Sequence, residues 1–123
     1  MLSNFTKKQF DFTFTPHLSP MFRGILTTIY LDLENGVNVS KVLKKLTNFY
    51  KNEKFVKVLK GDSMISTNDV INTNNCHISV CKTKYKNKIV ILSAIDNLIK
   101  GGSGQAVQNL NNKYNFPEST SLV

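Results

Sequence analysis

The sequence predicts an α+β domain with a mixed, largely antiparallel sheet and helices packed on it. Short β-branched and aromatic runs are separated by turn signals, and two segments repeat apolar residues at helical spacing. Their order, strand, strand, helix, strand, hairpin, helix, favours an antiparallel or mixed sheet. The 123 residues suffice for one ordinary domain, and no repeat or linker divides them.

The first half is expected to contain two strands and one helix. The run Phe10–Thr15 alternates aromatic and polar residues, and Pro16 ends it. A second β-branched run spans 24–33 and is closed by the turn signal Glu-Asn-Gly. Ser40 is expected to cap a helix over Lys41–Lys51, where apolar residues recur every three or four positions.

The second half is expected to contain short strands, a hairpin and a helix. Each strand is an apolar run with β-branched residues, and the helix places apolar side chains along one side. The expected elements are a strand at Phe55–Leu59, a loop over 61–75 with an edge strand near Val70 and Ile71, a strand at His77–Lys84, a hairpin turn at Lys86 and Asn87, a strand at Lys88–Ile95, and a helix at Gln105–Tyr114.

Charge and cysteine content narrow the classes of partner. The formal net charge is +8 and comes almost entirely from lysine, which is a weak signal for nucleic-acid recognition. Cys76 and Cys81 fall on opposite faces of an expected strand, and no Cys/His spacing predicts a metal site. No apolar run is long enough to span a bilayer. We therefore expect a reduced, cytoplasmic protein with neither a membrane nor a nucleic-acid partner.

A glycine-rich turn between a strand and a helix is the most informative feature of the sequence. Gly101, Gly102 and Gly104 follow the expected strand Lys88–Ile95 and open a helix rich in Gln and Asn. Glycines let a backbone approach a ligand closely, and a helix start offers unpaired N–H groups to an anion. Lys100 lies at this helix start, where it either holds substrate charge or is an ordinary surface lysine. The other interpretation of the glycines is tight packing of helix on strand.

A histidine and the single arginine follow the first expected strand. His17 lies between Pro16 and Pro20, and an imidazole can both give and take a proton near neutral pH. Taken alone, such a histidine is more often a loop or capping residue. Arg23 precedes Gly24, and its planar donor fork suits a phosphate or a carboxylate, although an ordinary solvated charge has the same appearance.

Together these segments resemble the C-terminal portion of the N-acetyl-gamma-glutamyl-phosphate reductase family, a relative of aspartate-semialdehyde dehydrogenase and glyceraldehyde-3-phosphate dehydrogenase. The matching motifs are Pro-His-x-x-Pro-Met, from Pro16, and Asp-Asn-Leu-x-Lys-Gly-x-x-Gly-Gln-Ala-Val-Gln-Asn, from Asp96 to Asn109. The resemblance covers 10–122. It implies that residues 1–123 are an incomplete C-terminal catalytic and dimerisation domain, in which 97–116 form a helix that returns toward a nucleotide-binding domain.

The resemblance also implies a reaction and a set of roles. Members of the family use NADPH to reduce an acyl phosphate to N-acetylglutamate semialdehyde in arginine biosynthesis, through a cysteine thiolate and a thioester. His17 matches the general acid–base histidine, and Arg23 and Lys100 are expected to hold substrate charge. Contacts to the cofactor or to the active site are expected at Asn97, Gly102, Gln105 and Asn109.

The chain also departs from the family pattern. The nucleophilic cysteine of the family lies in a Gly-Cys-x-x-Thr type segment, which this sequence lacks, and neither Cys76 nor Cys81 has an adjacent base in the sequence. No strand–glycine loop–helix unit of a nucleotide-binding domain precedes His17. We therefore expect the chain alone to be inactive. The resemblance also implies that the full-length enzyme is a dimer or tetramer.

Three other interpretations stay open. One is the sibling reductase that acts on a carrier-linked aminoadipyl phosphate in lysine biosynthesis. Another is a dimerisation domain without catalysis. The third is a basic module that binds polyanions, which is disfavoured because the lysines are scattered over helix, hairpin and termini.

Overall fold

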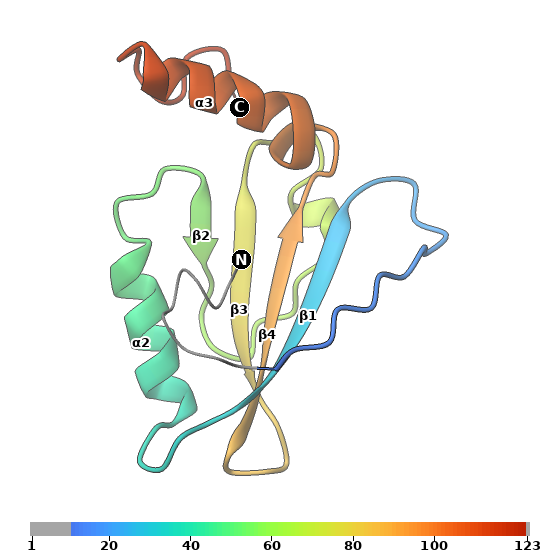
Figure 1. The fold of residues 1–123 in the computed structure, drawn as a ribbon, viewed down its shortest axis with the longest axis vertical. Coiled ribbons are helices and arrows are strands. Elements are labelled where there is room, and N and C mark those ends of the chain that lie inside the picture. Colours follow the sequence, from blue (N-terminus) through green and yellow to red (C-terminus); the bar gives the residue numbers. More distant parts are fainter. Residues whose placement is uncertain (1–10, 123) are drawn as a thin grey trace.

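The computed structural model describes residues 11–122, which form a four-stranded sheet with one helix beside it and one helix across its end (Figure 1). The strands lie in the order β1-β4-β3-β2. Strand β4 pairs antiparallel with both of its neighbours, whereas β2 pairs parallel with β3. The predicted α+β class with a mixed, largely antiparallel sheet is therefore confirmed. The strands are β1 (Ile25–Asp32), β2 (Val56–Val58), β3 (Cys76–Lys82) and β4 (Lys88–Ile95).

Helix α2 (Val39–Phe49) begins two residues earlier than the sequence predicted. The cap is Asn38, whose side-chain oxygen accepts the N–H of Lys41 at 2.9 Å, so Ser40 lies inside the helix. An Asn or a Ser can fill this role, and the structure uses the one that precedes Val39. The helix packs against β2 and β3.

The loop between β2 and β3 contains a 3₁₀ turn, η1 (Thr67–Asp69), in place of the predicted edge strand. Ser66 and Asp69 form a capping box that fixes this turn. Val70 is fully buried beneath the loop. The apolar pair at Val70 and Ile71 thus reflects packing of the loop on the sheet and not strand pairing.

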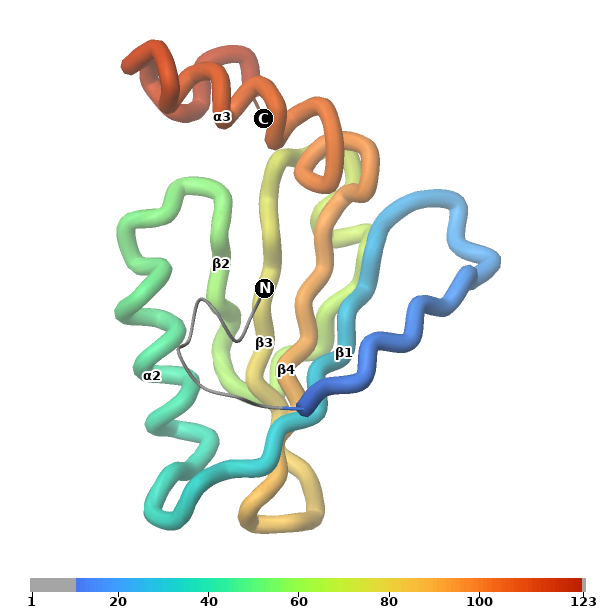
Figure 2. Tube along the Cα trace, viewed as in Figure 1, coloured from blue at the N-terminus to red at the C-terminus, as the bar shows by residue number. Residues whose placement is uncertain are grey.

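The strand predicted at the N-terminal end is absent from residues 11–15, and Phe10 lies outside the described residues. The segment runs past the edge of β1 without pairing (Figure 2), and residues 11–22 are all exposed. An alternating pattern produces a strand only where a sheet edge offers backbone partners. Among residues 11–122, β1 has a strand neighbour on one edge only.

The C-terminal part is helical from an earlier residue than predicted. A single π-helical turn, η2 (Ile99–Ser103), leads into α3 (Gly104–Lys113), which lies across the end of the sheet (Figure 1). The helix predicted at Gln105–Tyr114 is therefore confirmed to within one residue at each end. The glycine segment before it is helical except for a kink at Gly102, where φ is −148° and ψ is −108°.

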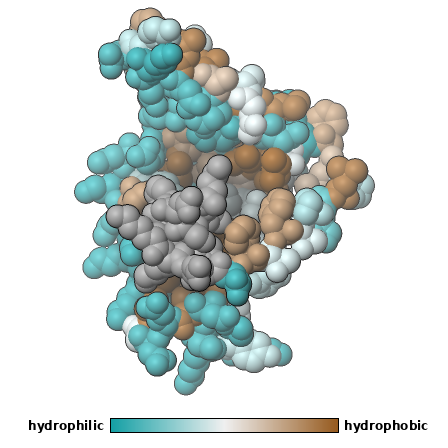
Figure 3. Space-filling model, in the orientation of Figure 1, coloured by the Kyte–Doolittle hydropathy of each residue, from teal (hydrophilic) through white to brown (hydrophobic). Residues whose placement is uncertain are grey.

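The core is small, and the surface is unusually apolar along β1. The buried apolar residues come from β3, β4 and the segments around β2, whereas every residue of β1 is exposed. Figure 3 shows hydrophobic side chains gathered on the side of the molecule that carries β1 and the segment before it. The buried apolar residues are Phe55, Val70, Val80, Ile89 and Ala94.

Candidate functional site

A buried carboxylate joins three separate segments at the end of the sheet where β1 begins and β4 ends. Asp96 follows β4 directly and is fully buried. Its Oδ1 accepts the N–H groups of Leu98 and Ile99 at 2.8 and 2.9 Å, and its Oδ2 accepts the N–H of Asn72 at 2.8 Å. The Nε of Arg23 lies 2.9 Å from Oδ2 as an ion pair, without the alignment of a hydrogen bond. Both oxygens of the carboxylate are therefore fully engaged.

These contacts set the charge state of Asp96. Burial alone raises the pKa of a carboxyl, but the N–H donors of Asn72, Ile99 and Leu98, followed by Arg23, outweigh it and lower the pKa of Asp96 to about 2. Asp96 is therefore a carboxylate throughout the neutral range. Its negative charge is balanced by Arg23, whose side chain is 20% exposed.

A second bond at this corner holds the backbone beside Arg23. The N–H of Gly24 donates to Oδ1 of Asn97 at 2.7 Å. Gly24 has a φ of +111°, and a Cβ at this position would lie 2.6 Å from Cβ of Thr67 in η1. Only glycine fits here, because the conformation is left-handed and the space is already filled. Two adjacent residues, Asp96 and Asn97, thus hold Arg23 and Gly24.

His17 lies six residues before Arg23 on the exposed segment. Its Nδ1 is 3.1 Å from the carbonyl oxygen of Thr15, and the Arg23–Gly24 corner joins the end of this segment to the sheet. The imidazole is exposed to solvent and so is accessible to a reactant. The structure brings Arg23 and Asn97 together, with His17 on the same loop as Arg23.

Four N–H groups at the expected helix start are bonded within the chain. The N–H of Gly101 donates to the carbonyl of Asp96 at 2.8 Å, and the N–H of Ser103 donates to the carbonyl of Leu98 at 2.9 Å. The N–H groups before them bind the Asp96 carboxylate. The chain therefore supplies its own anion to the N–H groups of Leu98 and Ile99.

Lys100 belongs to a polar network under α3. Its Nζ donates to Oε1 of Gln108 at 2.7 Å, and the same oxygen accepts Nδ2 of buried Asn74 at 2.8 Å. Nε2 of Gln108 donates to Glu118 at 2.6 Å. An ammonium can only donate and a carboxylate can only accept, so Lys100 and Glu118 fix the orientation of the Gln108 amide. Burial lowers the pKa of Lys100, while nearby Cys76, Glu118 and Glu53 act in the opposite direction.

The same network explains one glycine. The Oδ1 of Asn74 is buried without a hydrogen-bond partner and points at Gly104, where a Cβ would lie 2.5 Å from it. Asn111 continues the polar layer with bonds to the carbonyls of Glu118 and Thr120 at 3.1 and 2.9 Å. Here the glycine allows helix and strand end to pack closely, as the second interpretation of the sequence held.

The remaining predicted contact residues lie on the outer side of the helix. Gly102 is exposed, and the nearest atom to a Cβ placed there is the carbonyl oxygen of Asn97 at 3.5 Å. Nε2 of Gln105 donates to Oδ1 of Asn109 at 2.9 Å on the exposed surface. Their amide groups fit a neutral polar ligand but provide no charge for a phosphate.

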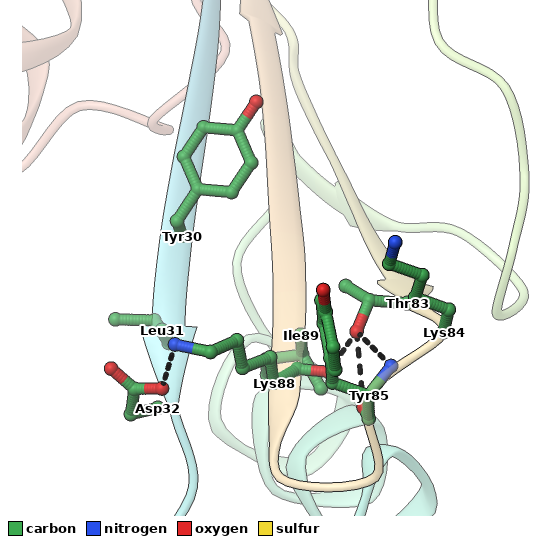
Figure 4. A pocket seen from close by; sticks show the side chains of 8 residues that line it. All are labelled: Tyr30, Leu31, Asp32, Thr83, Lys84, Tyr85, Lys88 and Ile89. Atoms are coloured by element: carbon green, nitrogen blue, oxygen red, sulfur yellow. Dashed lines mark hydrogen bonds and ion pairs between the residues drawn. The ribbon is translucent and has the colours of Figure 1, made fainter.

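The surface pockets lie at the opposite end of the sheet. The one drawn in Figure 4 is lined by β1, β4 and the hairpin, where Lys88 pairs with Asp32 at 2.5 Å and Thr83 binds the hairpin backbone. A second pocket lies beside the start of α2. Neither contains a predicted site residue. Within the described residues no cluster of His, Cys, Asp and Glu could hold a metal, both cysteines are free, and no helix is long and apolar enough to cross a membrane.

Sequence reasoning did not single out Asp96, Asn74, Gln108 or Gly24. Asp96 stood inside the matched motif, and an Asp directly between a strand and a helix is a capping signal that identifies such a residue. The partners Asn74 and Gln108 carry no comparable signal, because their contact joins residues far apart in the chain.

The chain is similar to one family of known proteins along most of its length. Residues 1–97 match the family described as semialdehyde dehydrogenase, dimerisation domain. The N-acetyl-gamma-glutamyl-phosphate reductase of Thermoanaerobacter pseudethanolicus is 47% identical over 121 residues, which are 98% of this chain and 35% of that protein. That of Clostridium botulinum strain Eklund 17B is 45% identical over 122 residues, 99% of this chain and 36% of the relative. A probable chloroplastic N-acetyl-gamma-glutamyl-phosphate reductase of Arabidopsis thaliana is 42% identical over 122 residues, 99% of this chain and 30% of the relative. The chain spans about a third of the length of these relatives.

Proposed function

Because the chain belongs to the semialdehyde dehydrogenase dimerisation-domain family, we propose that it supplies the histidine-bearing part of an N-acetyl-gamma-glutamyl-phosphate reductase. One observation carries the proposal. The two segments that resemble this family are 73 residues apart at Gly24 and Asn97, yet they are joined there by a bond of 2.7 Å. A site composed of both segments requires this arrangement.

The residues of this chain have distinct proposed roles. His17 would accept and return the proton as thiol attack and thiohemiacetal collapse proceed, because an imidazole serves both steps near neutral pH. Arg23 would hold the negative charge of the acyl-phosphate substrate through its Nη nitrogens, since its Nε faces Asp96. Lys100 would add positive charge nearby, although its Nζ is bound to Gln108.

The cofactor of the proposed reaction is NADPH, which supplies the hydride. Gly102, Gln105 and Asn109 are the candidates for its polar contacts, through exposed amides and backbone and not through a phosphate site, whereas the side-chain oxygen of Asn97 already binds the N–H of Gly24. The nucleophilic cysteine and most of the nucleotide-binding surface would come from the part of the relatives that this chain does not span. The chain alone would therefore not turn over NADPH.

A chimera tests this proposal directly. In it, this chain replaces the matching 121 residues of the Thermoanaerobacter pseudethanolicus reductase. We expect the chimera to catalyse NADPH-dependent reduction of N-acetylglutamyl phosphate and the isolated chain to show none. A folded chimera without this activity, or activity of the isolated chain, contradicts the proposal. An aminoadipyl phosphate linked to a carrier protein is assayed in parallel. We expect the chimera not to reduce it, and reduction of this substrate would favour the sibling reductase of lysine biosynthesis.

The role of His17 is tested against the other histidine of the chain. In the chimera, His17→Asn should lower kcat by about 10²–10⁴-fold, the usual contribution of a general acid–base residue. His77→Asn is the matched control, because His77 lies within β3 in a half-buried position away from the matched motifs. Equal losses in both variants contradict a catalytic role for His17.

The apolar β1 surface favours a second proposed function, self-association. Leu26, Ile29 and Leu31 are 43%, 40% and 40% exposed, and Tyr30 is 78% exposed. Contiguous exposed apolar surface on an edge strand marks an interface. We expect the chimera to be a dimer or a larger oligomer by light scattering, and Ile29→Lys to shift it toward the monomer. A monomeric parent contradicts this function. We also propose a cytoplasmic location, because the relatives are named as biosynthetic reductases.

A further inference from the structure

We propose that Asp96 and Asn97 are positioning residues that anchor the segment bearing His17 and Arg23 to the end of β4. The inference rests on the proposed function, because it concerns how that site is held. It also changes the role expected for Asn97, from a contact with the cofactor to a contact with the chain itself. The inference rests on two contacts: the side chain of Asp96 pairs with Arg23, and the side chain of Asn97 binds the N–H of Gly24.

Asp96 fixes the direction of the Arg23 side chain. The carboxylate is itself immobilised by three backbone N–H groups, two from the turn into α3 and one from Asn72 in the loop after η1. Its remaining site faces Nε of Arg23 at 2.9 Å. A guanidinium is planar, so pairing at Nε sets the plane and the direction of both Nη nitrogens. Within residues 11–122, the ion pair of Arg23 with Asp96 uses Nε and leaves these two nitrogens outside it. They can donate two parallel hydrogen bonds to a pair of oxygens of a carboxylate or a phosphate.

Asn97 fixes the backbone one residue further along. Its Oδ1 takes the N–H of Gly24, whose left-handed conformation turns the chain sharply into β1. Thr67 fills the space beside Gly24, so the turn cannot move toward η1. The backbone at Gly24 is thus bonded to Asn97, and the side chain of Thr67 prevents it from moving toward η1.

The anchor matters because it lies at the point where the segment that bears His17 enters the sheet. Residues 11–22 are all exposed and have no regular structure. A hydrogen bond and an ion pair at residues 23 and 24 therefore set where this loop leaves the sheet, and with it the position from which His17 must act. Misplacement of a catalytic group by about 1 Å can cost a large factor in rate.

Kinetics of the chimera distinguish positioning from cofactor contact. Asn97→Ala removes the acceptor for Gly24, whereas Asn97→Asp keeps an acceptor oxygen, loses the amide donor and adds a negative charge beside Asp96. If Asn97 positions the loop, Asn97→Ala lowers kcat about tenfold, the value of one lost hydrogen bond, and leaves KM for NADPH unchanged. Asn97→Asp then retains most of the activity. A raised KM for NADPH in both variants, with kcat preserved, overturns the proposal in favour of cofactor contact.

Trypsin gives a readout that needs no activity. Arg23 is the single arginine of the chain, and cleavage at Arg23–Gly24 requires that the corner opens. We expect Asn97→Ala and Asp96→Asn to be cut there about tenfold faster than the parent, because cleavage follows the population of the open form. Cleavage at Lys84–Tyr85 in the exposed hairpin is the internal control.

The outcomes separate this inference from the proposed function. An inactive parent chimera contradicts the proposed function, while the tryptic rates at Arg23 still decide the anchor. Faster cleavage only at Arg23–Gly24 supports the anchor. Unchanged cleavage at Arg23 in Asn97→Ala overturns it, as does an equal increase at both bonds, because general loosening of the fold would then explain the effect.

Discussion

Replacing Gly104 with alanine should destabilise the chain although it places a better helix former at the start of α3. Elsewhere in a helix the change from Gly to Ala favours folding by about 0.5–1 kcal/mol. At Gly104 the new Cβ would lie 2.5 Å from Oδ1 of Asn74, 2.5 Å from Cγ2 of Ile99 and 3.0 Å from the Ile99 carbonyl oxygen. Contact distances are about 3.5–4.0 Å, so two neighbours must move by about 1 Å.

The magnitude follows from what must move. Overpacking of this kind costs about 1–3 kcal/mol. Asn74 is fully buried and held by Gln108, so displacing it also weakens a buried hydrogen bond worth about 1 kcal/mol. After subtraction of the helix-propensity gain, we expect Gly104→Ala to lower the free energy of unfolding by about 2 kcal/mol.

Gly101→Ala is the matched control, because it lies in the adjacent π turn and its Cβ would meet its nearest neighbours at 3.4 Å. We expect it to change the stability by less than about 1 kcal/mol. The assay is urea unfolding of the chain followed by circular dichroism, with both variants measured beside the parent. If Gly104→Ala is as stable as Gly101→Ala, the packing argument for the polar network under α3 is wrong.

Three further predictions concern the buried polar groups and the corner. The pKa of Asp96 in the folded chain is lowered to about 2, so its contribution to stability is complete above its ordinary pKa near 4 and is lost as the pH falls through 2. Acid unfolding of the parent and of Asp96→Asn tests this. The stability of the variant should not fall over this pH range. Gly24→Ala should cost more than Gly36→Ala, by about 1–2 kcal/mol in urea unfolding, because both have positive φ but only Gly24 meets the threonine of η1. Gln108→Leu should cost about 2 kcal/mol by leaving its buried partners unpaired, whereas Gln105→Leu on the exposed side should cost under about 0.5 kcal/mol by the same assay. An equal loss of stability in Gly24→Ala and Gly36→Ala would contradict the steric argument, and an equal loss in Gln108→Leu and Gln105→Leu would contradict the argument from buried hydrogen bonds.

The elements that depend on local pattern were predicted well from the sequence. β1, the β3–β4 hairpin and α3 follow from β-branched runs, turn residues and helical spacing, and each lies within a few residues of its predicted bounds. The failures share a physical cause. The N-terminal alternating run leaves the open edge of β1 unpaired and Val70 packs beneath a loop, because alternation and apolarity indicate burial and do not specify a pairing partner.

The candidate site shows the same division. His17, Arg23 and Asn97 could be chosen from motifs, and Asp96 carries a capping signal, but its pairing with Arg23 and Asn72 could not be predicted because these residues come from distant parts of the chain. The N–H groups at the helix start were assigned to an external anion for a related reason. A helix start attracts negative charge whatever its source, and here Asp96 provides it.

The glycines of the segment after β4 therefore do not share one explanation. Gly104 is required by packing, because Asn74 and Ile99 occupy the space of its side chain. Gly101 and Gly102 are exposed, and a Cβ at either would make only ordinary contacts, although the backbone of Gly102 leaves helical geometry at a kink with φ −148° and ψ −108°. The close approach of another molecule is what a glycine permits at such positions. If the proposed reductase site lies here, its partner surface therefore faces Gly101 and Gly102, while Gly104 serves the interior.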